Sequence, residues 1–307
     1  MRAVLDQDAT LTAGLTIGPD GQHAVLLVGS ERLHPGQAEE LARWADALSD
    51  AAKVARIATI AGYGRTDDGR GYLLTRVQPS LSDQLRLMGQ PTPEQARHII
   101  ALIADALATA HSYGIVHGAV SPTTILTDPH GVLLGGFGAT APSLAAPLGL
   151  WALTPPEHRP AALAGEFAAS VAGDVFSLAA SMCVILAGSL PWADPATWAD
   201  VADLPSRPDA PPWALAVRDA LSADPDQRPN AEEFAGALRD PENVSLVEFP
   251  GVKVDLRSLI PRQVGRLSAF STEAMAGDEA PATGRARPSG HLSGSSIRVH
   301  STVRDTT

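Results

Sequence analysis

Apolar positions divide the chain into a strand-rich first part and a helical second part. Three short runs, at residues 24–28, 57–61 and 72–77, have the alternation or the β-branched content of strands in a small sheet. Residues 38–48 lie between the first two runs and place apolar side chains at helical spacing. We therefore predict a small sheet with one helix in residues 1–78.

A long helix is predicted to follow. Thr92 is a suitable N-cap, Pro93 fits the first helical position, and Gln95 completes a capping box. The apolar positions of this helix are Ile99, Ile100, Leu102, Ile103 and Leu107. We expect it to end at Gly114, and we expect the chain up to about residue 238 to be mainly helical with Pro-rich joins.

The longest apolar run, residues 176–190, is interrupted by Ser177 and Ser181 and is followed by Pro191. It is shorter than the roughly 20 residues that a membrane-spanning helix needs, so we interpret it as a buried helix and expect no transmembrane segment. Residues 1–10 lack the apolar core of a secretory signal, and we expect a cytoplasmic protein.

Two short segments resemble motifs of a known protein family. Residues 115–126 read IVHGAVSPTTIL, and residues 136–138 read GFG. They resemble the catalytic loop H-R-D-x-K-P-x-N-I-L and the D-F-G motif of protein kinases. Three further segments resemble other motifs of that family: PPE at 155–157, DVFSL at 174–178 and DPDQRP at 224–229. The resemblance implies an α+β, two-lobed kinase-like fold, with a β-rich N-lobe at 1–78 and a helical C-lobe at 79–240.

The same resemblance shows which reactive groups are missing. The catalytic base position holds Ala119, the loop Lys position holds Ser121, the metal-binding Asn position holds Thr124, and the D-F-G Asp position holds Gly136. The strand Lys that grips the nucleotide phosphates would fall at Leu26. Phosphoryl transfer rests on positioning and charge neutralisation, so we predict a pseudokinase with no catalytic, cofactor-binding or metal-binding residues.

Lysine content supports this interpretation. The chain has only two lysines, Lys53 in an expected helix-to-strand connection and Lys253 beyond the domain. No G-x-G-x-x-G precedes the first strand, and residues 18–21 are expected to form an ordinary turn. Without a Lys partner, Glu39 and Glu40 are expected to be solvated charges.

Four residues are expected to have structural roles that follow from the resemblance. His117 would be the structural His of the loop, and Asp174 would brace the loop backbone. Glu157 would pair with Arg228 inside the large lobe. These residues keep the architecture of a kinase while the chemistry is absent.

Composition narrows the class of protein further. The single cysteine, Cys183, lies in an apolar run and implies neither a disulfide framework nor a C-x-x-C metal site. The net charge of −11 argues against nucleic acid as a partner. The Arg-rich, Lys-poor usage suggests a bacterial source with a high-GC genome.

The chain beyond the predicted lobes differs in character. Residues 251–307 hold eight Lys or Arg and five Asp or Glu, a local charge of +3, whereas residues 1–250 carry −14. Residues 241–276 form an extension in which residues 244–270 keep a moderate apolar pattern. Either this extension docks on the large lobe or a partner, or it caps the domain. Residues 277–307 are rich in Gly, Ser, Pro, Thr and Arg, which predicts a disordered tail.

Thr302 is a candidate phospho-acceptor in this tail. With Asp305 three residues later it resembles the phosphothreonine ligand of a forkhead-associated domain. The expected partners are therefore a Ser/Thr protein kinase and a phosphopeptide-binding forkhead-associated protein. Less specific acceptors are Ser289, Ser293, Ser295, Ser296, Ser301 and Thr306.

Three functional hypotheses follow from the sequence. The first is a non-catalytic scaffold or regulator in Ser/Thr kinase signalling that is itself a phosphoprotein. The second is an atypical phosphoryl or nucleotidyl transferase of low activity, whose only nearby acids would be Asp128, Glu157 and Asp174. The third is a sensor that binds a small apolar ligand in the former nucleotide cleft.

Overall fold

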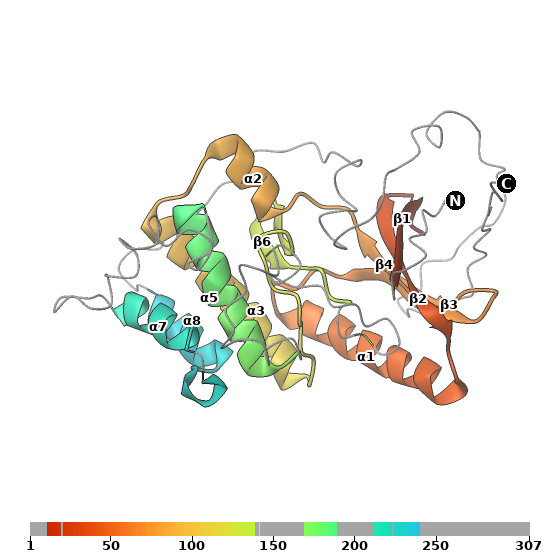
Figure 1. Cartoon of the computed structure of the whole chain (residues 1–307). Coiled ribbons are helices and arrows are strands. Elements are labelled where there is room, and N and C mark those ends of the chain that lie inside the picture. The colour runs from red at the N-terminus through yellow and green to blue at the C-terminus, as the bar shows by residue number, and fades with distance from the viewer. Residues whose placement is uncertain are drawn as a thin grey trace, which may run out of the picture.

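The computed structural model describes residues 11–19, 21–138, 141, 169–188, 212–222 and 224–239. The predicted extension at 241–276 and the predicted tail at 277–307 lie outside these residues. Within the described part, strands dominate the first segment and helices dominate the second (Figure 1).

A four-stranded antiparallel sheet and one long helix form the small lobe. Its elements are β1 (Leu11–Ile17), β2 (His23–Arg32), α1 (Pro35–Val54), β3 (Ile60–Arg65) and β4 (Arg70–Arg76). The strand order is β1-β2-β4-β3, so β2 and β4 are central and β1 and β3 form the edges. The turn between β1 and β2 is short: Gly18 N donates to Gln22 O and Gly21 N donates to Gly18 O. This is the ordinary turn that the sequence predicted.

The helix α1 is longer than its apolar pattern suggested. It begins at Pro35, directly after the N-cap His34, and Gln37 Oε1 accepts from His34 N at 2.9 Å. Its buried face carries Leu41, Ala45 and Leu48, which belong to the same apolar core as the β2 residues on that side of the sheet. Lys53 lies in the last turn of α1 and not in the connection to β3, because the helix continues to Val54.

The large lobe is mainly helical, and the predicted boundary between residues 78 and 79 falls between β4 and α2. Its elements are α2 (Leu81–Met88), α3 (Pro93–Ser112), β5 (Ile125–Asp128), β6 (Gly131–Leu134), α5 (Val171–Ala187), α7 (Pro212–Ala220), the 3₁₀ turn η4 (Pro225–Gln227) and α8 (Ala231–Leu238). The helix α3 is the centre of the lobe, with α5 and α8 packed beside it (Figure 1).

The start of α3 confirms its sequence signature. Gln95 N donates to Thr92 Oγ1 at 3.3 Å, and Thr92 N donates to Gln95 Oε1 at 3.0 Å. Pro93 occupies the first turn, and the helix ends ahead of Gly114, which has a φ of 73°. The capping box therefore fixes the start of the helix at the predicted residue.

The apolar run that begins at Phe176 belongs to α5, as predicted. Ser170 caps this helix by accepting from Gly173 N, and Gly188 ends it in the left-handed conformation. Cys183 is 1% exposed, so the single thiol is a packing residue. Among the described helices, none has the length and apolar character that a membrane crossing requires.

Backbone hydrogen bonds tie the β5–β6 hairpin to the small lobe and to the connection that leaves it. In the segment between α1 and β3, Leu134 N donates to Arg56 O at 2.8 Å and Ala58 N donates to Leu134 O at 2.9 Å. In the connection between β4 and α2, Thr127 N donates to Pro79 O at 2.8 Å. The hairpin therefore contacts the small lobe directly and also holds the start of the large lobe.

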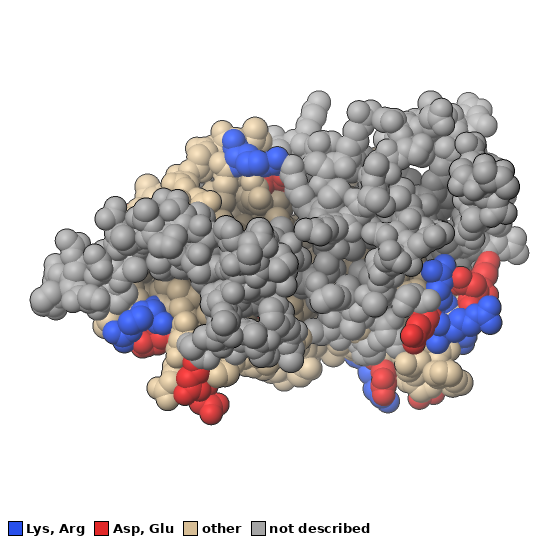
Figure 2. Space-filling model, in the orientation of Figure 1, with Lys and Arg blue, Asp and Glu red and all other residues tan. Residues whose placement is uncertain are grey.

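The charged surface is mixed in sign. On the face shown in Figure 2, basic and acidic side chains of the described residues lie next to one another. Two exposed ion pairs of the described residues join opposite charges, Lys53 with Asp50 at 2.6 Å and Arg218 with Asp219 at 2.7 Å. Exposed pairs of this kind contribute little to stability.

Candidate functional site

A buried carboxylate holds the loop between α3 and β5. Asp174 lies in the first turn of α5 and is 1% exposed. Its Oδ1 accepts from Gly118 N at 2.7 Å, and its Oδ2 accepts from His117 N at 2.7 Å. His111 Nε2 lies 2.9 Å from the same Oδ2. Both carboxylate oxygens are thus used to fix the loop backbone against α5.

The His117 ring connects this loop to the GFG segment. Its Nδ1 accepts from Ala119 N at 3.1 Å, so the proton is on Nε2, which donates to Gly135 O at 2.7 Å. The ring meets the edge of Phe137 with centroids 4.4 Å apart. Burial lowers the pKa of His117, and the neutral ring is the form that these contacts accommodate.

Three hydroxyl groups occupy the positions that follow Ala119. Ser121, Thr123 and Thr124 are all buried. Ser121 Oγ lies 2.7 Å from Thr123 Oγ1. Ser121 N donates to Thr124 Oγ1 at 2.9 Å, and that hydroxyl lies within donating distance of Ala119 O, at 3.0 Å. The loop therefore uses these side chains to bond its own backbone.

Gly136, at the D-F-G Asp position, packs directly against Thr124. A Cβ on Gly136 would lie 2.5 Å from Thr124 Cγ2, well inside van der Waals contact. Gly136 also has a φ of +74°, a region that favours glycine. The two positions at which the resemblance places metal ligands thus hold a threonine, whose hydroxyl bonds its own loop, and a glycine.

Leu26 does not lie where the strand Lys of a kinase would lie. That Lys pairs with a Glu of the following helix, so it must lie on the helix side of its strand. Leu26 belongs to the apolar cluster on the other face of the sheet, whereas Leu27 belongs to the core that includes α1. Leu27 Cδ1 is 3.0 Å from where a Cβ on Gly138 would lie. Adjacent strand residues point to opposite faces, so the residue that corresponds to the strand Lys is Leu27 and not Leu26.

The remaining charges near α1 do not replace this Lys. Lys53 is paired with Asp50, and both side chains are exposed. Glu39 and Glu40 are exposed on α1, which confirms that they are solvated charges. Among the described residues, no group of three or more His, Cys, Asp or Glu could hold a metal ion.

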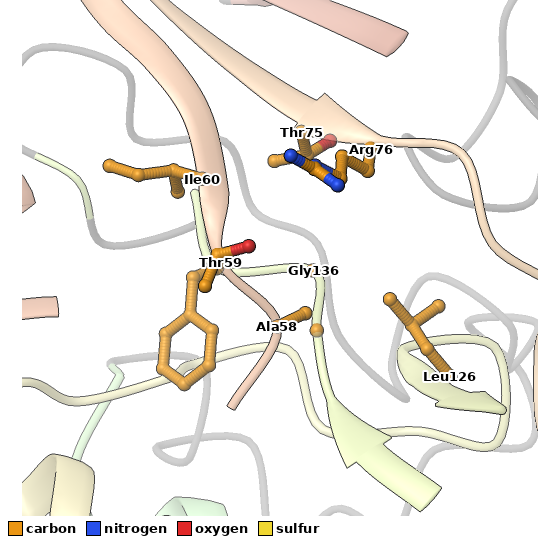
Figure 3. Close-up of a pocket in the computed structure, with 9 residues that line it drawn as sticks. Ala58, Thr59, Ile60, Thr75, Arg76, Leu126 and Gly136 are labelled. Carbon is orange, nitrogen blue, oxygen red and sulfur yellow. The ribbon is translucent and has the colours of Figure 1, made fainter. Parts of the chain in front are cut away.

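A small pocket lies between the lobes beside Gly136. Figure 3 shows Thr75 and Arg76 projecting from β4 on one side and Leu126 on another. The residues that line it are Ala58, Thr59, Ile60, Thr75, Arg76, Leu126, Gly135, Gly136 and Phe137. Its walls are therefore mainly apolar, with two hydroxyl groups and one guanidinium.

Arg228 ties the end of the domain to the start of α5. It is 8% exposed; its Nε donates to Ser222 O at 2.9 Å and its Nη1 donates to Ala172 O at 3.2 Å. Its guanidinium also lies over the Phe176 ring, 4.8 Å from the centroid. The expected partner Glu157 lies outside the described residues, as does Thr302.

Sequence reasoning missed two residues of this site. His111 contacts Asp174 across 63 positions, and no spacing pattern connects them. Leu27 sits in a continuous apolar run, where the sequence carries no mark of which residue faces the helix.

Comparisons with known proteins bear on the fold. No protein-family model matches the chain. The serine/threonine-protein kinase PkaB of Streptomyces coelicolor is 35% identical over 113 residues, which are 33% of this chain and 27% of that protein. The crystal structure of Rad53 1–466 in complex with AMP-PNP matches with a TM-score of 0.51 and 24% identity. That match covers 78% of this chain and 63% of the Rad53 chain.

The chain therefore has a protein-kinase-like fold of the α+β class, as the sequence predicted. It spans about a quarter of the length of the curated relative and less than two thirds of the solved chain.

Proposed function

We propose that this chain is a catalytically inactive pseudokinase that works through protein contacts in Ser/Thr kinase signalling. The observation that carries the proposal is the packing of Thr124 against Gly136, where a Cβ would come within 2.5 Å of the Thr124 methyl. Kinases need an Asp and an Asn there to hold magnesium. The Thr124 hydroxyl bonds the backbone of its own loop, and Gly136 has no side chain, so neither position supplies the carboxylate or amide oxygen that a kinase uses.

The rest of the cleft supports the same proposal. Ala119 has no side-chain group that could accept the proton of a substrate hydroxyl. Leu27 presents an apolar side chain toward Gly138, where a kinase presents its phosphate-binding ammonium. Phosphoryl transfer depends on groups that neutralise charge, so losing all of them removes the basis for catalysis.

An atypical transferase is less well supported. Of its candidate acids, Asp174 already accepts from the loop N–H groups with both oxygens. Asp128 Oδ1 accepts from His130 N at 2.7 Å within the β5–β6 turn. Both carboxylates thus have structural tasks.

A small-ligand sensor is favoured by one specific observation, the pocket beside Gly136. Its mainly apolar walls would suit a compact apolar molecule. A thermal-shift screen of small apolar metabolites tests this. The matched variants are Ala58→Trp, which would fill the pocket, and Ala52→Trp on α1, outside it.

The catalytic part of the proposal is tested with labelled ATP. The full chain is incubated with γ-labelled ATP and magnesium, alone and with a generic protein substrate, beside an active Ser/Thr kinase domain. We expect no label on either protein and no magnesium-dependent ATP binding by calorimetry. Stoichiometric autophosphorylation would overturn the proposal.

The proposed partners are a Ser/Thr kinase that phosphorylates the tail and a forkhead-associated domain that binds it. The support is the Thr302 context, because phosphate adds charge and acceptor oxygens that suit an Arg-lined pocket. Calorimetry with phosphorylated and unphosphorylated peptides of residues 295–307 tests it. Binding of the phosphopeptide alone is expected, and equal affinities would remove this partner.

A further inference from the structure

The small sheet buries apolar side chains on both of its faces. One face, here called the outer face, consists of alternate residues of the two central strands: Ala24, Leu26, Val28, Tyr72 and Leu74. Each of these residues is only 1–2% exposed. An antiparallel sheet with one face in water alternates apolar and polar residues, and these strands do not. The outer face is therefore built to be covered.

The helix of the small lobe does not provide this cover. It packs with the opposite face, where Val25, Leu27 and Leu73 share the core with Leu41 of α1. In the part of the chain that the structure describes, the outer-face cluster contains only strand residues, with Ala61 packed against it. Figure 1 shows α1 running along one side of the sheet. A second segment has to account for burial of the outer face.

Residues 252–257 have the pattern that such a segment requires. They read V-K-V-D-L-R, a strict alternation of apolar and charged side chains. In an extended conformation Val252, Val254 and Leu256 share one face, and the charged residues share the other. One face would suit the apolar sheet, and the opposite face would suit water. Pro250 and Gly251 directly before it are turn residues, which sets a clear start.

We propose that residues 252–257 dock in extended form on the outer face, with Val252, Val254 and Leu256 against β2 and β4. The linker between α8 and this segment is longer, when extended, than a 20-residue helix of the domain. The 13 steps from Arg239 to Val252 span up to about 45 Å when extended. A 20-residue helix such as α1 is about 30 Å long. Docking concerns the small lobe, so it holds whether or not the cleft binds a nucleotide.

Disulfide scanning in the full chain tests the proposal. Leu26→Cys is combined in turn with Val252→Cys, Val254→Cys and Leu256→Cys, and the native Cys183 is buried and should stay silent. Two matched controls each place one cysteine on the opposite face. In the first, Leu27→Cys on the α1 side of the sheet replaces Leu26→Cys. In the second, Lys253→Cys on the charged face of the segment replaces the cysteine at 252, 254 or 256. If Leu26→Cys does not fold, Leu74→Cys on the same face takes its place.

We expect an intramolecular disulfide between the outer-face cysteine and at least one apolar-face partner, at roughly tenfold the yield of either control. Equal yields with the controls, or no disulfide in any pair, would overturn the proposal. A disulfide-linked dimer would overturn it in favour of a second copy of the chain. Residues 297–303 also show a partial alternation of apolar and polar side chains. If Val299→Cys forms the disulfide with Leu26→Cys, and cysteines at 252, 254 and 256 do not, residues 297–303 are the segment that covers the outer face.

Discussion

Thr124 and Gly136 occupy one shared space. Thr124 Oγ1 lies 3.0 Å from Ala119 O and accepts from Ser121 N, and these bonds hold its methyl toward Gly136. A Cβ on Gly136 would therefore meet a side chain that cannot rotate away without breaking them. The contact links the two motifs at which kinase chemistry would be assembled.

The first prediction is that Gly136→Ala destabilises the chain by about 2–4 kcal/mol. Overpacking costs about 1–3 kcal/mol, and a non-glycine residue at positive φ adds roughly 1 kcal/mol. Gly114 is a matched control, because its φ is +73° and a Cβ there meets nothing within 4 Å. The difference between the two variants in urea unfolding gives the steric part. If Gly136→Ala and Gly114→Ala lower the free energy of unfolding equally, the Thr124 side chain can move aside without loss of stability.

The second prediction is that Asp174→Asn lowers the free energy of unfolding by about 2–4 kcal/mol. The amide keeps the shape of the side chain but turns an NH₂ group toward backbone donors, and a buried donor without an acceptor costs about 1–3 kcal/mol. Asp219→Asn, at an exposed ion pair, should change stability by less than about 1 kcal/mol. Thermal and urea unfolding check both variants. Similar small effects would contradict a bracing role.

Much of the fold was visible in local sequence signals. Thr92, Pro93 and Gln95 define the start of α3 without tertiary information, since the cap is made within four residues. The strand β1 was missed although its apolar residues Leu11, Ala13, Leu15 and Ile17 alternate with Thr12, Gly14 and Thr16, which is a strand pattern. The β5–β6 hairpin and α2 were also missed, although Ser80 and Asp83 form a capping box at the start of α2.

The sequence predicted which residues occupy the candidate site, but it did not predict which of their side chains contact one another. The motif spacing identified positions 119, 124 and 136, yet the packing of Thr124 against Gly136 depends on a rotamer fixed by hydrogen bonds. The sequence placed the residue that corresponds to the strand Lys at Leu26 and not at Leu27 for a related reason. Both faces of β2 are apolar, so the run lacks the alternation that would assign a face.

The third prediction concerns Arg228. Replacement by Ala removes the bonds to Ser222 O and Ala172 O and the contact with the Phe176 ring. Hydrogen bonds from charged groups contribute about 1.5–3 kcal/mol each, so a loss of about 2–5 kcal/mol is expected. Arg228→Lys should recover only part of it, because an ammonium lacks the planar fork. Full recovery by Lys would show that charge alone matters.

The fourth prediction is a loss of stability in acid that depends on His117. Burial lowers the pKa of His117 below its unfolded value of about 6.5, so the unfolded chain binds more protons between the two values. The stabilising contribution is therefore fully present above about pH 6.5 and is lost as the pH falls toward the folded pKa. Urea unfolding at about pH 7.5 and pH 5.5 measures the difference.

The variant His117→Gln isolates this contribution. It should be less stable at both pH values and should lose less stability than the parent on acidification, because Gln does not titrate. His98→Gln is the control: burial also lowers the pKa of His98, but that side chain is only partly buried, so its removal should change the pH dependence less. Long-range ¹⁵N NMR of the parent should show the His117 proton on Nε2 at neutral pH, as the bond to Gly135 O requires. An unchanged pH dependence in His117→Gln would assign the acid sensitivity to other groups.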